Sequence, residues 1–146
     1  EFTQQGFVFY TNYTSGKGQA IANNNNVCVS FFWPSLERQI IITGKAVKIS
    51  EENSIAYFNK RPRESQLGAV VSDQSTVIES REALEVKLLQ LEKHYDNKTI
   101  VKPNHWGGYL IQPTSYEFWQ GRSSRLHDRI KYTKNGNSWS IGRLQP

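Results

Sequence analysis

Aromatic and β-branched residues gather in short runs along the chain, and polar or glycine-rich stretches separate these runs. Such runs are typical of β-strands, because their side chains pack well on a pleated sheet. Seven of them predict strands, over residues 6–11, 27–33, 38–49, 109–112, 116–120, 129–133 and 138–144. Gly44 lies inside the third strand and indicates a bulge or a close approach of backbone. Asn135-Gly136 predicts a tight hairpin turn between the last two strands.

Between the strands, the spacing of apolar residues changes to that of helices. It predicts four helices, over residues 17–24, 51–60, 63–71 and 81–95. Ser50 and Ser80 stand where N-caps are expected, and Pro62 separates the two middle helices. The last helix carries one apolar packing stripe, formed by Leu84, Leu88, Leu91 and Tyr95. Strands with inserted helices, without repeats or linkers, predict a single α+β domain over residues 1–146, built around an antiparallel barrel.

The chain of 146 residues has a formal net charge of +5, which favours anionic partners such as phosphorylated small molecules, nucleic acid or anionic lipid. No run of about 18 apolar residues exists, so we expect no membrane-spanning helix. The lone Cys28 stands in an apolar run, and we expect it to be buried, in keeping with a reducing, cytoplasmic location. The chain has no Met and opens shortly before a strand, so we expect that an N-terminal part is missing.

A cluster of cationic residues follows Trp119. If residues 125–129 are extended, the side chains of Arg125, His127 and Arg129 share one face of the strand. Cationic groups on one face repel each other, and either an anionic partner or Asp128 and other nearby acids must relieve this repulsion. Arginine is suited to such a partner, since it binds phosphate and stacks on planar anionic rings. A solvated edge strand with scattered charges explains the pattern equally well.

A second candidate group has helical spacing, because Tyr57, Arg61 and Ser65 follow one another at intervals of four residues. If the two helices stay coaxial across Pro62, the three side chains point the same way. A phenol, a guanidinium and a hydroxyl together are suited to hold a phosphate. From spacing alone, an exposed polar face is the more frequent explanation.

A third group consists of hydrogen-bonding residues at predicted strand ends and turns: Thr11, Lys17, Gln39, Gln74 and Ser75. These side chains can bond a heterocycle or a phosphate, although similar residues occur on every protein surface. The three histidines are too far apart in the sequence for a metal signature, and no cysteine pair supports one. We therefore expect no metal site.

Several motifs resemble, in order and with consistent spacing, those of the pyridoxine 5′-phosphate oxidase family. The C-terminal motifs are Trp106-Gly107-Gly108, Phe118-Trp119-Gln120-Gly121, Arg125-Leu126-His127-Asp128-Arg129 and Arg143-Leu144-Gln145-Pro146. The N-terminal motifs are Gly6-Phe7-Val8-Phe9-Tyr10-Thr11-Asn12, Leu36-Glu37-Arg38-Gln39, Tyr57-Phe58, Arg61-Pro62-Arg63, Ser65-Gln66-Leu67-Gly68-Ala69 and Ser72-Asp73-Gln74-Ser75. The resemblance covers essentially the whole chain.

This resemblance implies an antiparallel split β-barrel with inserted helices, which works as a homodimer and binds FMN at the subunit interface. It implies oxidation of a phosphorylated B6 vitamer, pyridoxamine or pyridoxine 5′-phosphate, to pyridoxal 5′-phosphate. Molecular oxygen takes the electrons and leaves as hydrogen peroxide. The flavin accepts a hydride equivalent from C4′ of the substrate, while phosphate binding remote from C4′ holds the ring in place.

By position, the resemblance implies that FMN is contacted by Tyr10, Thr11, Lys17, Gln39, Gln74, Ser75, Trp119 and Arg129. It implies a cradle for the substrate phosphate, formed by Tyr57, Arg61 and Ser65. Arg125 and His127 correspond to catalytic residues over the substrate ring and its reacting carbon. On this interpretation Arg125 covers the exposed ring face, and His127 either orients the substrate or helps to move a proton.

Two departures from the family pattern remove positive charge from the expected FMN phosphate site. An upstream strand with an Arg and a Lys is absent, and Gly16 stands where many members have an Arg. We therefore expect this chain to bind FMN weakly or not at all.

Two other functional classes remain as alternatives. A non-catalytic split-barrel protein would bind pyridoxal phosphate or flavin without turnover, and the full set of Arg125, His127 and the phosphate cradle argues against it. A nucleic-acid-binding module would need basic residues interleaved with exposed aromatic residues. Most aromatic residues here lie in predicted strand interiors, so we expect neither nucleic acid nor a membrane as a partner.

Overall fold

The computed structural model describes all 146 residues, and its strands form one seven-stranded sheet. The strands are β1 (Phe2–Thr3), β2 (Gly6–Asn12), β3 (Asn26–Trp33), β4 (Arg38–Lys48), β5 (Trp106–Gln120), β6 (Asp128–Asn135) and β7 (Ser138–Leu144). Their order is β1-β2-β5-β4-β3, while β6 pairs with β5 and with β7. Every pair with a described register is antiparallel: β1 with β2, β3 with β4, β5 with β6 and β6 with β7.

Four helices are inserted between the strands, and each predicted helix is confirmed with bounds shifted by at most one residue. They are α1 (Gly16–Asn23), α2 (Glu51–Lys60), α3 (Arg63–Val71) and α4 (Arg81–His94), and two short 3₁₀ turns are η1 (Pro34–Leu36) and η2 (Ser123–Arg125). The Oγ atoms of Ser50 and Ser80 accept hydrogen bonds from the backbone N–H groups of Asn53 and Ala83. The two serines therefore cap α2 and α4 as their positions predict.

One prediction about the strands is wrong, because residues 109–112 and 116–120 belong to the single strand β5. Pro113 lies in its interior and is buried, and it does not end the strand. Next to it, the hydroxyl groups of Thr43 and Ser115 are hydrogen-bonded at 2.7 Å. Gly44 confirms the expected close approach, since a Cβ atom there would lie 2.3 Å from the carbonyl oxygen of Gln112. Side-chain bonding and close backbone contact thus keep this strand continuous where proline supplies no N–H donor.

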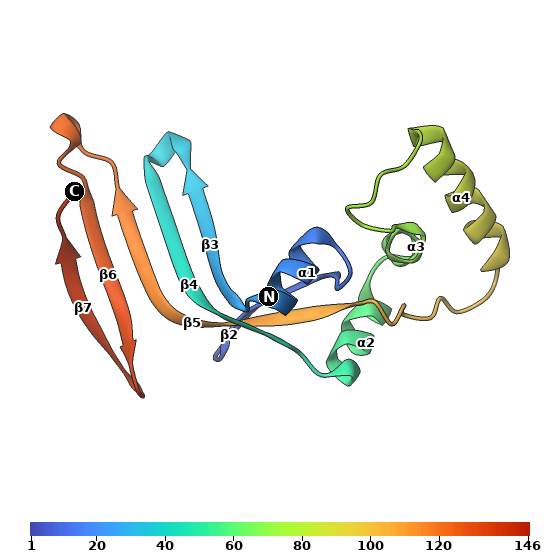
Figure 1. Cartoon of the computed structure of the whole chain (residues 1–146), viewed down its shortest axis with the longest axis horizontal. Helices are drawn as coiled ribbons and strands as arrows, with labels where there is room; N and C mark the ends of the chain where they lie inside the picture. The colour runs from blue at the N-terminus through green and yellow to red at the C-terminus, as the bar shows by residue number, and fades with distance from the viewer. The chain divides into compact units, whose positions relative to one another are not determined.

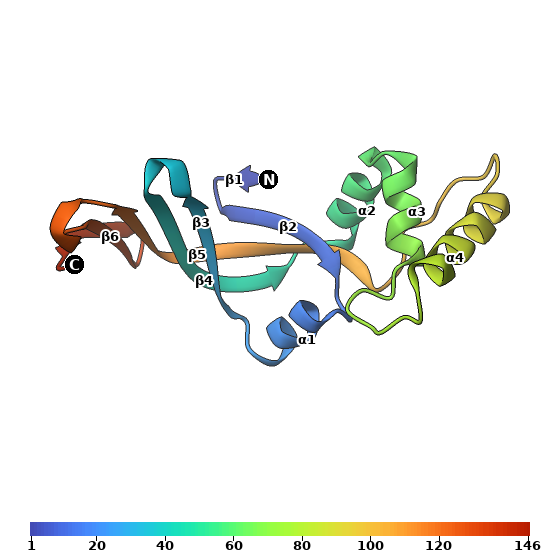
Figure 2. The same cartoon turned by 90° about the horizontal axis from the view of Figure 1, so that it is seen from above.

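The chain divides into two compact units, and each is described by itself; the prediction of a single domain stays a prediction. The first unit contains Glu1, Val8–Asn23 and Lys48–Leu110. Its buried core consists of Phe58, Leu67, Ile100 and Trp106. The α4 stripe packs against this core through Leu88, Leu91 and Tyr95, and α3 and α4 lie side by side (Figure 1 and Figure 2). Three of the four stripe residues therefore pack as the periodicity predicts, whereas Leu84 is exposed.

A buried lysine fixes the segment that leads into β5. The ammonium group of Lys102 donates to the carbonyl oxygens of Pro103 and Trp106, at 2.9 and 2.7 Å. It also forms an ion pair with Glu51 at 2.9 Å, and its side chain is only 3% exposed. A buried ammonium is tolerated because all three of its donor positions have partners. These contacts of Lys102 hold the backbone around Trp106 in place.

The second unit contains Phe2–Phe7, Asn24–Val47 and Ile111–Pro146. Its strands form two hairpins, β3–β4 and β6–β7, which Figure 1 shows in cyan and red. The predicted turn at Asn135-Gly136 is confirmed, with Gly136 at a φ of +60°. This unit also carries many exposed apolar side chains, among them Phe31, Phe32, Trp33, Leu36, Phe118, Trp139 and Ile141.

Cys28 is exposed, so the expectation that it is buried is wrong. Successive residues of a strand point to opposite faces, and on β3 it is Val27 and Val29 that are half-buried. Cys28 therefore lies on the open face of the strand. No helix of the structure combines the length and the apolar character needed to cross a membrane.

Candidate functional site

A pocket of about 230 Å³ lies in the first unit, beside the junction of α2 and α3. It is lined by Asn12, Arg61, Ser65, Gly68, Ala69, Ser72, Gln74 and Trp106. We refer to it as the Arg61 pocket. Two of the three residues predicted to hold a phosphate, Arg61 and Ser65, are therefore brought together, because Pro62 starts α3 directly after the end of α2.

Arg61 is held by its backbone and by an aromatic face, but one end of its guanidinium is unsatisfied. Its backbone N–H donates to the carbonyl oxygen of Phe58 and ends α2. Its Cζ atom lies 4.8 Å from the centre of the Trp106 ring, a cation–π distance. Its Nη1 atom is buried and has no hydrogen-bond partner. A buried donor without a partner is costly, and an anion in the pocket removes that cost.

Tyr57, the third predicted phosphate residue, does not line the pocket and belongs to an aromatic stack behind it. The rings of Tyr57 and Tyr10 are parallel, with centroids 3.6 Å apart, and Tyr10 also stacks on Trp106 at 5.5 Å. Burial, followed by the nearby charges of Glu1 and Tyr57, raises the pKa of Tyr10 to about 12. Tyr10 is thus a neutral phenol at neutral pH. The stack fixes the Trp106 ring against which Arg61 rests.

Three of the residues predicted to contact FMN form a hydrogen-bonded chain in the same unit. Lys17 Nζ donates to Thr11 Oγ1 at 3.3 Å, and Thr11 Oγ1 donates to Gln74 Oε1 at 3.2 Å. Gln74 Oε1 also accepts from the backbone N–H of Asn12 at 3.2 Å. Ser75, a fourth predicted contact, adjoins Gln74 and has a left-handed φ of +73°. Since Gln74 also lines the Arg61 pocket, these polar groups and the predicted phosphate residues are neighbours.

The remaining predicted FMN contacts lie in the second unit. A hollow of about 430 Å³ is lined by Trp33, Arg38, Gln39, Ile40, Phe118, Trp119, Gln120, Arg122, Asp128 and Ile130. We refer to it as the Trp119 hollow. Gln39 and Trp119 are thus brought together, and Gln39 Nε2 donates to Ser30 Oγ at 3.1 Å. Arg129 does not line the hollow; its Nε forms an ion pair with Glu117 at 2.7 Å, and its Nη1 donates to the carbonyl oxygen of Gln145.

The prediction that residues 125–129 are extended is wrong. Residues 123–125 form the turn η2, in which Ser124 and Arg125 have left-handed φ values of +56° and +60°, and β6 begins only at Asp128. Arg125 therefore does not share a strand face with His127 and Arg129, and its side chain is exposed. A strand pattern failed here because a tight turn closes the connection from β5 to β6 within a few residues.

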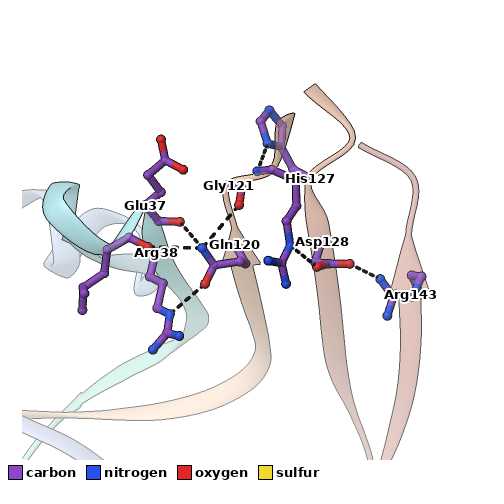
Figure 3. A network of polar contacts seen from close by, with 9 residues as sticks. Glu37, Arg38, Gln120, Gly121, His127, Asp128 and Arg143 are labelled. Atoms are coloured by element: carbon purple, nitrogen blue, oxygen red, sulfur yellow. Dashed lines mark hydrogen bonds and ion pairs between the residues drawn. The ribbon is translucent and has the colours of Figure 1, made fainter. Parts of the chain in front are cut away.

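His127 is oriented by a backbone amide and lies against an indole. The backbone N–H of Arg122 donates to His127 Nδ1 at 3.1 Å (Figure 3). The centroid of the imidazole lies 4.9 Å from that of Trp119, with the planes tilted by 47°. His127 and Trp119 are thus brought together at the edge of the hollow, while Arg125 is presented by the adjoining turn.

Several residues at these sites had no role assigned from the sequence. They are Asn12 and Trp106 in the Arg61 pocket, and Arg122 at the Trp119 hollow. Trp106 had a usable signal, since a tryptophan before two glycines can lie flat against neighbouring backbone. Asp128 was expected as an acid that offsets nearby cations, and the cations that it pairs with are Arg122 and Arg143. Neither signal specified which cation each residue contacts.

Two protein families match the chain. Residues 1–95 match the family described as pyridoxamine 5′-phosphate oxidase. Residues 106–146 match the family described as the pyridoxine 5′-phosphate oxidase C-terminal dimerisation region.

Curated relatives and solved structures agree with these matches. The pyridoxine/pyridoxamine 5′-phosphate oxidase of Flavobacterium psychrophilum is 58% identical over 100% of the chain and 69% of its own length. That of Christiangramia forsetii is 57% identical over 99% of the chain and 68% of its own length. PhzG from Burkholderia lata, solved with tetrahydrophenazine-1-carboxylic acid, has a TM-score of 0.90 and 29% identity, and it is covered to 71% by the whole chain.

A second solved structure shows the same fold at lower identity. It is a pyridoxamine 5′-phosphate oxidase-related, FMN-binding protein from Nostoc punctiforme. Its TM-score is 0.74 at 17% identity, over 100% of the chain and 76% of its own length. The predicted fold class, an α+β antiparallel split barrel of the FMN-binding type with inserted helices, is confirmed by these likenesses.

Proposed function

Since this chain belongs to the pyridoxine/pyridoxamine 5′-phosphate oxidase family of FMN-dependent oxidoreductases, we propose that it oxidises pyridoxamine or pyridoxine 5′-phosphate to pyridoxal 5′-phosphate. Molecular oxygen is the proposed acceptor, with hydrogen peroxide as the second product. The observation that carries this proposal is the buried, unpartnered Nη1 atom of Arg61 in a pocket that also contains Ser65. The two side chains are suited to a dianionic phosphate group.

The Arg61 pocket supports a phosphate in chemistry and in size. Its volume of about 230 Å³ exceeds what a single phosphate group needs. Its polar lining supplies the guanidinium of Arg61, the hydroxyls of Ser65 and Ser72, and the side-chain amides of Asn12 and Gln74. No carboxylate lines it, so nothing opposes an anion there. A phosphate held here fixes one end of the substrate. The orientation of its ring then determines where C4′ lies.

The hydrogen-bonded chain of Thr11, Lys17 and Gln74 supports FMN binding. The donors it offers to a ligand are the ammonium group of Lys17 and the amide NH₂ of Gln74, because the Thr11 hydroxyl and the Asn12 N–H already donate to Gln74 Oε1. Such a set is suited to a phosphate ester and to the polar edge of a heterocycle. Gln39, Trp119 and Arg129 are the proposed contacts from the second unit. When bound, FMN supplies the two-electron acceptor that no side chain of the chain can provide.

Arg125 and His127 are the proposed catalytic residues. The exposed guanidinium of Arg125 has the flat shape and charge needed to cover an electron-rich pyridine ring. His127 lies within 4.9 Å of Trp119 and keeps Nε2 available to a substrate oxygen. Their task is to orient the ring and to exclude water from its reacting face.

A homodimer is part of the proposal. Residues 106–146 match a family described as a dimerisation region, and the second unit exposes Phe31, Phe118, Trp139 and Ile141. Exposed aromatic and aliphatic side chains of this number are typical of surfaces that a partner covers. Sedimentation velocity of the FMN-loaded protein tests this, and a monomer at micromolar concentration would contradict it. The cytoplasm stays the predicted location.

The test of the proposed reaction is an absorbance experiment. The purified protein is incubated with FMN, desalted and mixed anaerobically with pyridoxamine 5′-phosphate. The proposal requires a protein-bound flavin spectrum that bleaches with this substrate and recovers when air is admitted. A flavin that survives desalting would also contradict the expectation, drawn from Gly16 and the absent upstream strand, that FMN binds weakly or not at all. Unphosphorylated pyridoxamine is the control, and we expect it to bleach the flavin far more slowly because the Arg61 pocket then holds nothing.

Two other outcomes would replace the proposal. Retention of FMN or pyridoxal phosphate without bleaching by any B6 vitamer would indicate the non-catalytic split-barrel binder. Bleaching by tetrahydrophenazine-1-carboxylic acid, the ligand of the Burkholderia protein, but not by pyridoxamine 5′-phosphate would indicate a different substrate class. Equal rates with pyridoxamine and its phosphate would show that the Arg61 pocket does not bind phosphate.

A further inference from the structure

Arg122 makes two contacts that close the connection between β5 and β6. Its backbone N–H donates to His127 Nδ1 at 3.1 Å. Its side-chain Nε donates to Asp128 Oδ2 at 2.8 Å, and the other oxygen of Asp128 accepts from Arg143 Nη1 on β7 (Figure 3). One residue thus bonds both the imidazole and the carboxylate that follows it. We refer to residues 121–128, closed in this way, as the Arg122 loop.

The first contact determines the tautomer of His127. A backbone amide nitrogen can only donate, so Nδ1 must offer its lone pair to the Arg122 N–H group. A neutral imidazole carries one proton, which therefore resides on Nε2. The nitrogen that is free to meet a ligand is then a hydrogen-bond donor and not a base.

The second contact closes a loop whose backbone is unfavourable by itself. Ser124 and Arg125 both have left-handed φ values, which residues with a side chain rarely adopt. The bond from the Leu126 N–H to the carbonyl oxygen of Ser123 closes the turn itself. The ion pair between Arg122 and Asp128 joins the two ends of the turn from outside. Strain of this kind persists where surrounding contacts determine the conformation, and it is frequent at functional sites.

The base of the loop is anchored to the η1 turn by Gln120 and Gly121. Gln120 Oε1 accepts from Arg38 Nε at 2.7 Å, and its Nε2 donates to the carbonyl oxygen of Glu37 (Figure 3). The backbone N–H of Gly121 donates to the same carbonyl oxygen at 2.7 Å. A Cβ atom at Gly121 would lie 2.8 Å from the Cβ of Glu37, so this approach needs glycine. The ion pair of Arg122 therefore starts from a fixed stem.

We propose that Arg122 is a positioning residue that holds His127 in its Nε2-protonated form and holds the turn that presents Arg125. His127 then serves the substrate as a hydrogen-bond donor through Nε2. This inference rests on the proposed function, in which His127 and Arg125 meet the substrate ring. Asp128 fixes the guanidinium of Arg122 through its ion pair, and Arg143 in turn fixes the carboxylate of Asp128.

The tautomer is tested by nitrogen NMR of the FMN-loaded protein labelled with ¹⁵N-histidine. The chain has three histidines, and the spectrum of His127→Gln assigns the signals of His127 by their loss. We expect a protonated Nε2 and an unprotonated Nδ1 that accepts a hydrogen bond. In Asp128→Asn and Arg122→Ala, we expect the His127 signals to shift toward a mixture of tautomers. A proton on Nδ1 in the unaltered protein, or unchanged His127 signals in both variants, would overturn the proposal.

Kinetics test whether Nε2 acts as a hydrogen-bond donor. Glutamine places an amide nitrogen near the position of Nε2, whereas asparagine places one near Nδ1. We expect His127→Gln to keep about tenfold more kcat than His127→Asn, a ratio that corresponds to ~1.4 kcal/mol. Equal losses in the two variants would contradict a donor role for Nε2.

Arg122→Ala is expected to lower kcat for pyridoxamine 5′-phosphate about tenfold with little change in KM, and Arg122→Lys is expected to recover part of the loss. Lys134→Ala, an exposed cation on the same strand as Asp128, is the matched control and should leave kcat unchanged. Unchanged kcat in Arg122→Ala, while the unaltered protein turns over, would refute the positioning role alone. Absence of turnover in the unaltered protein would refute the proposed function, and the NMR result would still decide the tautomer.

Discussion

Arg61 and Arg122 line the two candidate sites, but their guanidinium groups are satisfied in opposite ways. Arg61 has a buried Nη1 without a hydrogen-bond partner and rests on the face of Trp106. Arg122 is exposed, and its Nε is engaged by the carboxylate of Asp128 at 2.8 Å. The guanidinium of Arg61 has no anionic partner in the chain, whereas that of Arg122 is already paired with a carboxylate of the same chain.

This difference separates a residue that binds a ligand from one that shapes the protein. A buried guanidinium with a free donor gains most from an incoming phosphate, because solvent has already been removed. An exposed pair contributes little binding energy, yet it can hold backbone in a chosen conformation. The number of arginines near a pocket is therefore a poor guide to its ligand. The partner of each guanidinium is a better one.

The largest expected effect concerns the core under the Arg61 pocket. Phe58 is fully buried and meets Trp106 edge to face at 5.3 Å. Phe58→Ala should lower the free energy of unfolding by about 3–5 kcal/mol, since it leaves a cavity in the first unit. Urea unfolding followed by circular dichroism measures this. Ile55→Ala, at an exposed position of the same helix, is the control and should change stability far less.

The next effect concerns Arg61 itself. Arg61→Gln should lower kcat/KM for pyridoxamine 5′-phosphate about 100-fold, a loss of ~3 kcal/mol from charged hydrogen bonds to phosphate. The free energy of unfolding should stay the same or rise, because the variant removes a buried guanidinium nitrogen that has no hydrogen-bond partner. Lys60→Gln, at the neighbouring exposed position, is the control. A stability loss without a change in kcat/KM would make Arg61 a structural residue and reverse the comparison with Arg122.

Most of the fold could be predicted from the sequence because local signals coincide with tertiary structure. Serine caps mark the starts of α2 and α4, and the predicted bounds of all four helices hold within a residue at each end. The exceptions arise where tertiary contacts override a local signal. Pro113 suggests a strand break, yet hydrogen bonding between Thr43 and Ser115 carries β5 past it. Cys28 is apolar but exposed, because the half-buried side chains of β3 are those of its neighbours Val27 and Val29.

The site could be predicted only in part, for a similar reason. Arg61 and Ser65 meet in the pocket because Arg61 directly follows α2 and Ser65 lies in the first turn of α3, on either side of Pro62. The helical spacing did not extend to Tyr57, because Arg61 has an extended backbone that interrupts the helix. The prediction that Arg125 and His127 share a strand face failed, because Arg125 lies in the turn η2, where side chains do not alternate between two faces. Trp106 is distant in sequence from Arg61, so only the folded chain brings the indole under the guanidinium.

A smaller effect should follow from the aromatic face under Arg61. Trp106→Phe keeps a ring but weakens the cation–π contact, which is worth about 1 kcal/mol at a partly exposed site. KM for pyridoxamine 5′-phosphate should rise about threefold with little change in kcat, as steady-state oxygen consumption would measure. Trp139→Phe, in the second unit, should leave KM unaltered. If both substitutions raise KM equally, the stack does not act through Arg61.

The smallest effect concerns the ion pair of the Arg122 loop and its dependence on pH. Hydrogen bonds from Arg122 and then Arg143 lower the pKa of Asp128 below its ordinary value of 3.8. A carboxyl group with a lowered pKa stabilises the folded state above that ordinary value, and this stabilisation is lost as the pH falls through the folded pKa. The Tm difference between the unaltered protein and Asp128→Asn should therefore be small and constant from pH 7 to about 5, and it should shrink below 3.8. Because Asp128 is exposed, salt should reduce the difference further. A Tm difference that persists unchanged in acid would mean that Asp128 supports the loop through its shape and hydrogen bonds and not through its charge. The contrast between the two guanidinium groups would then rest on the unpartnered Nη1 atom of Arg61 alone.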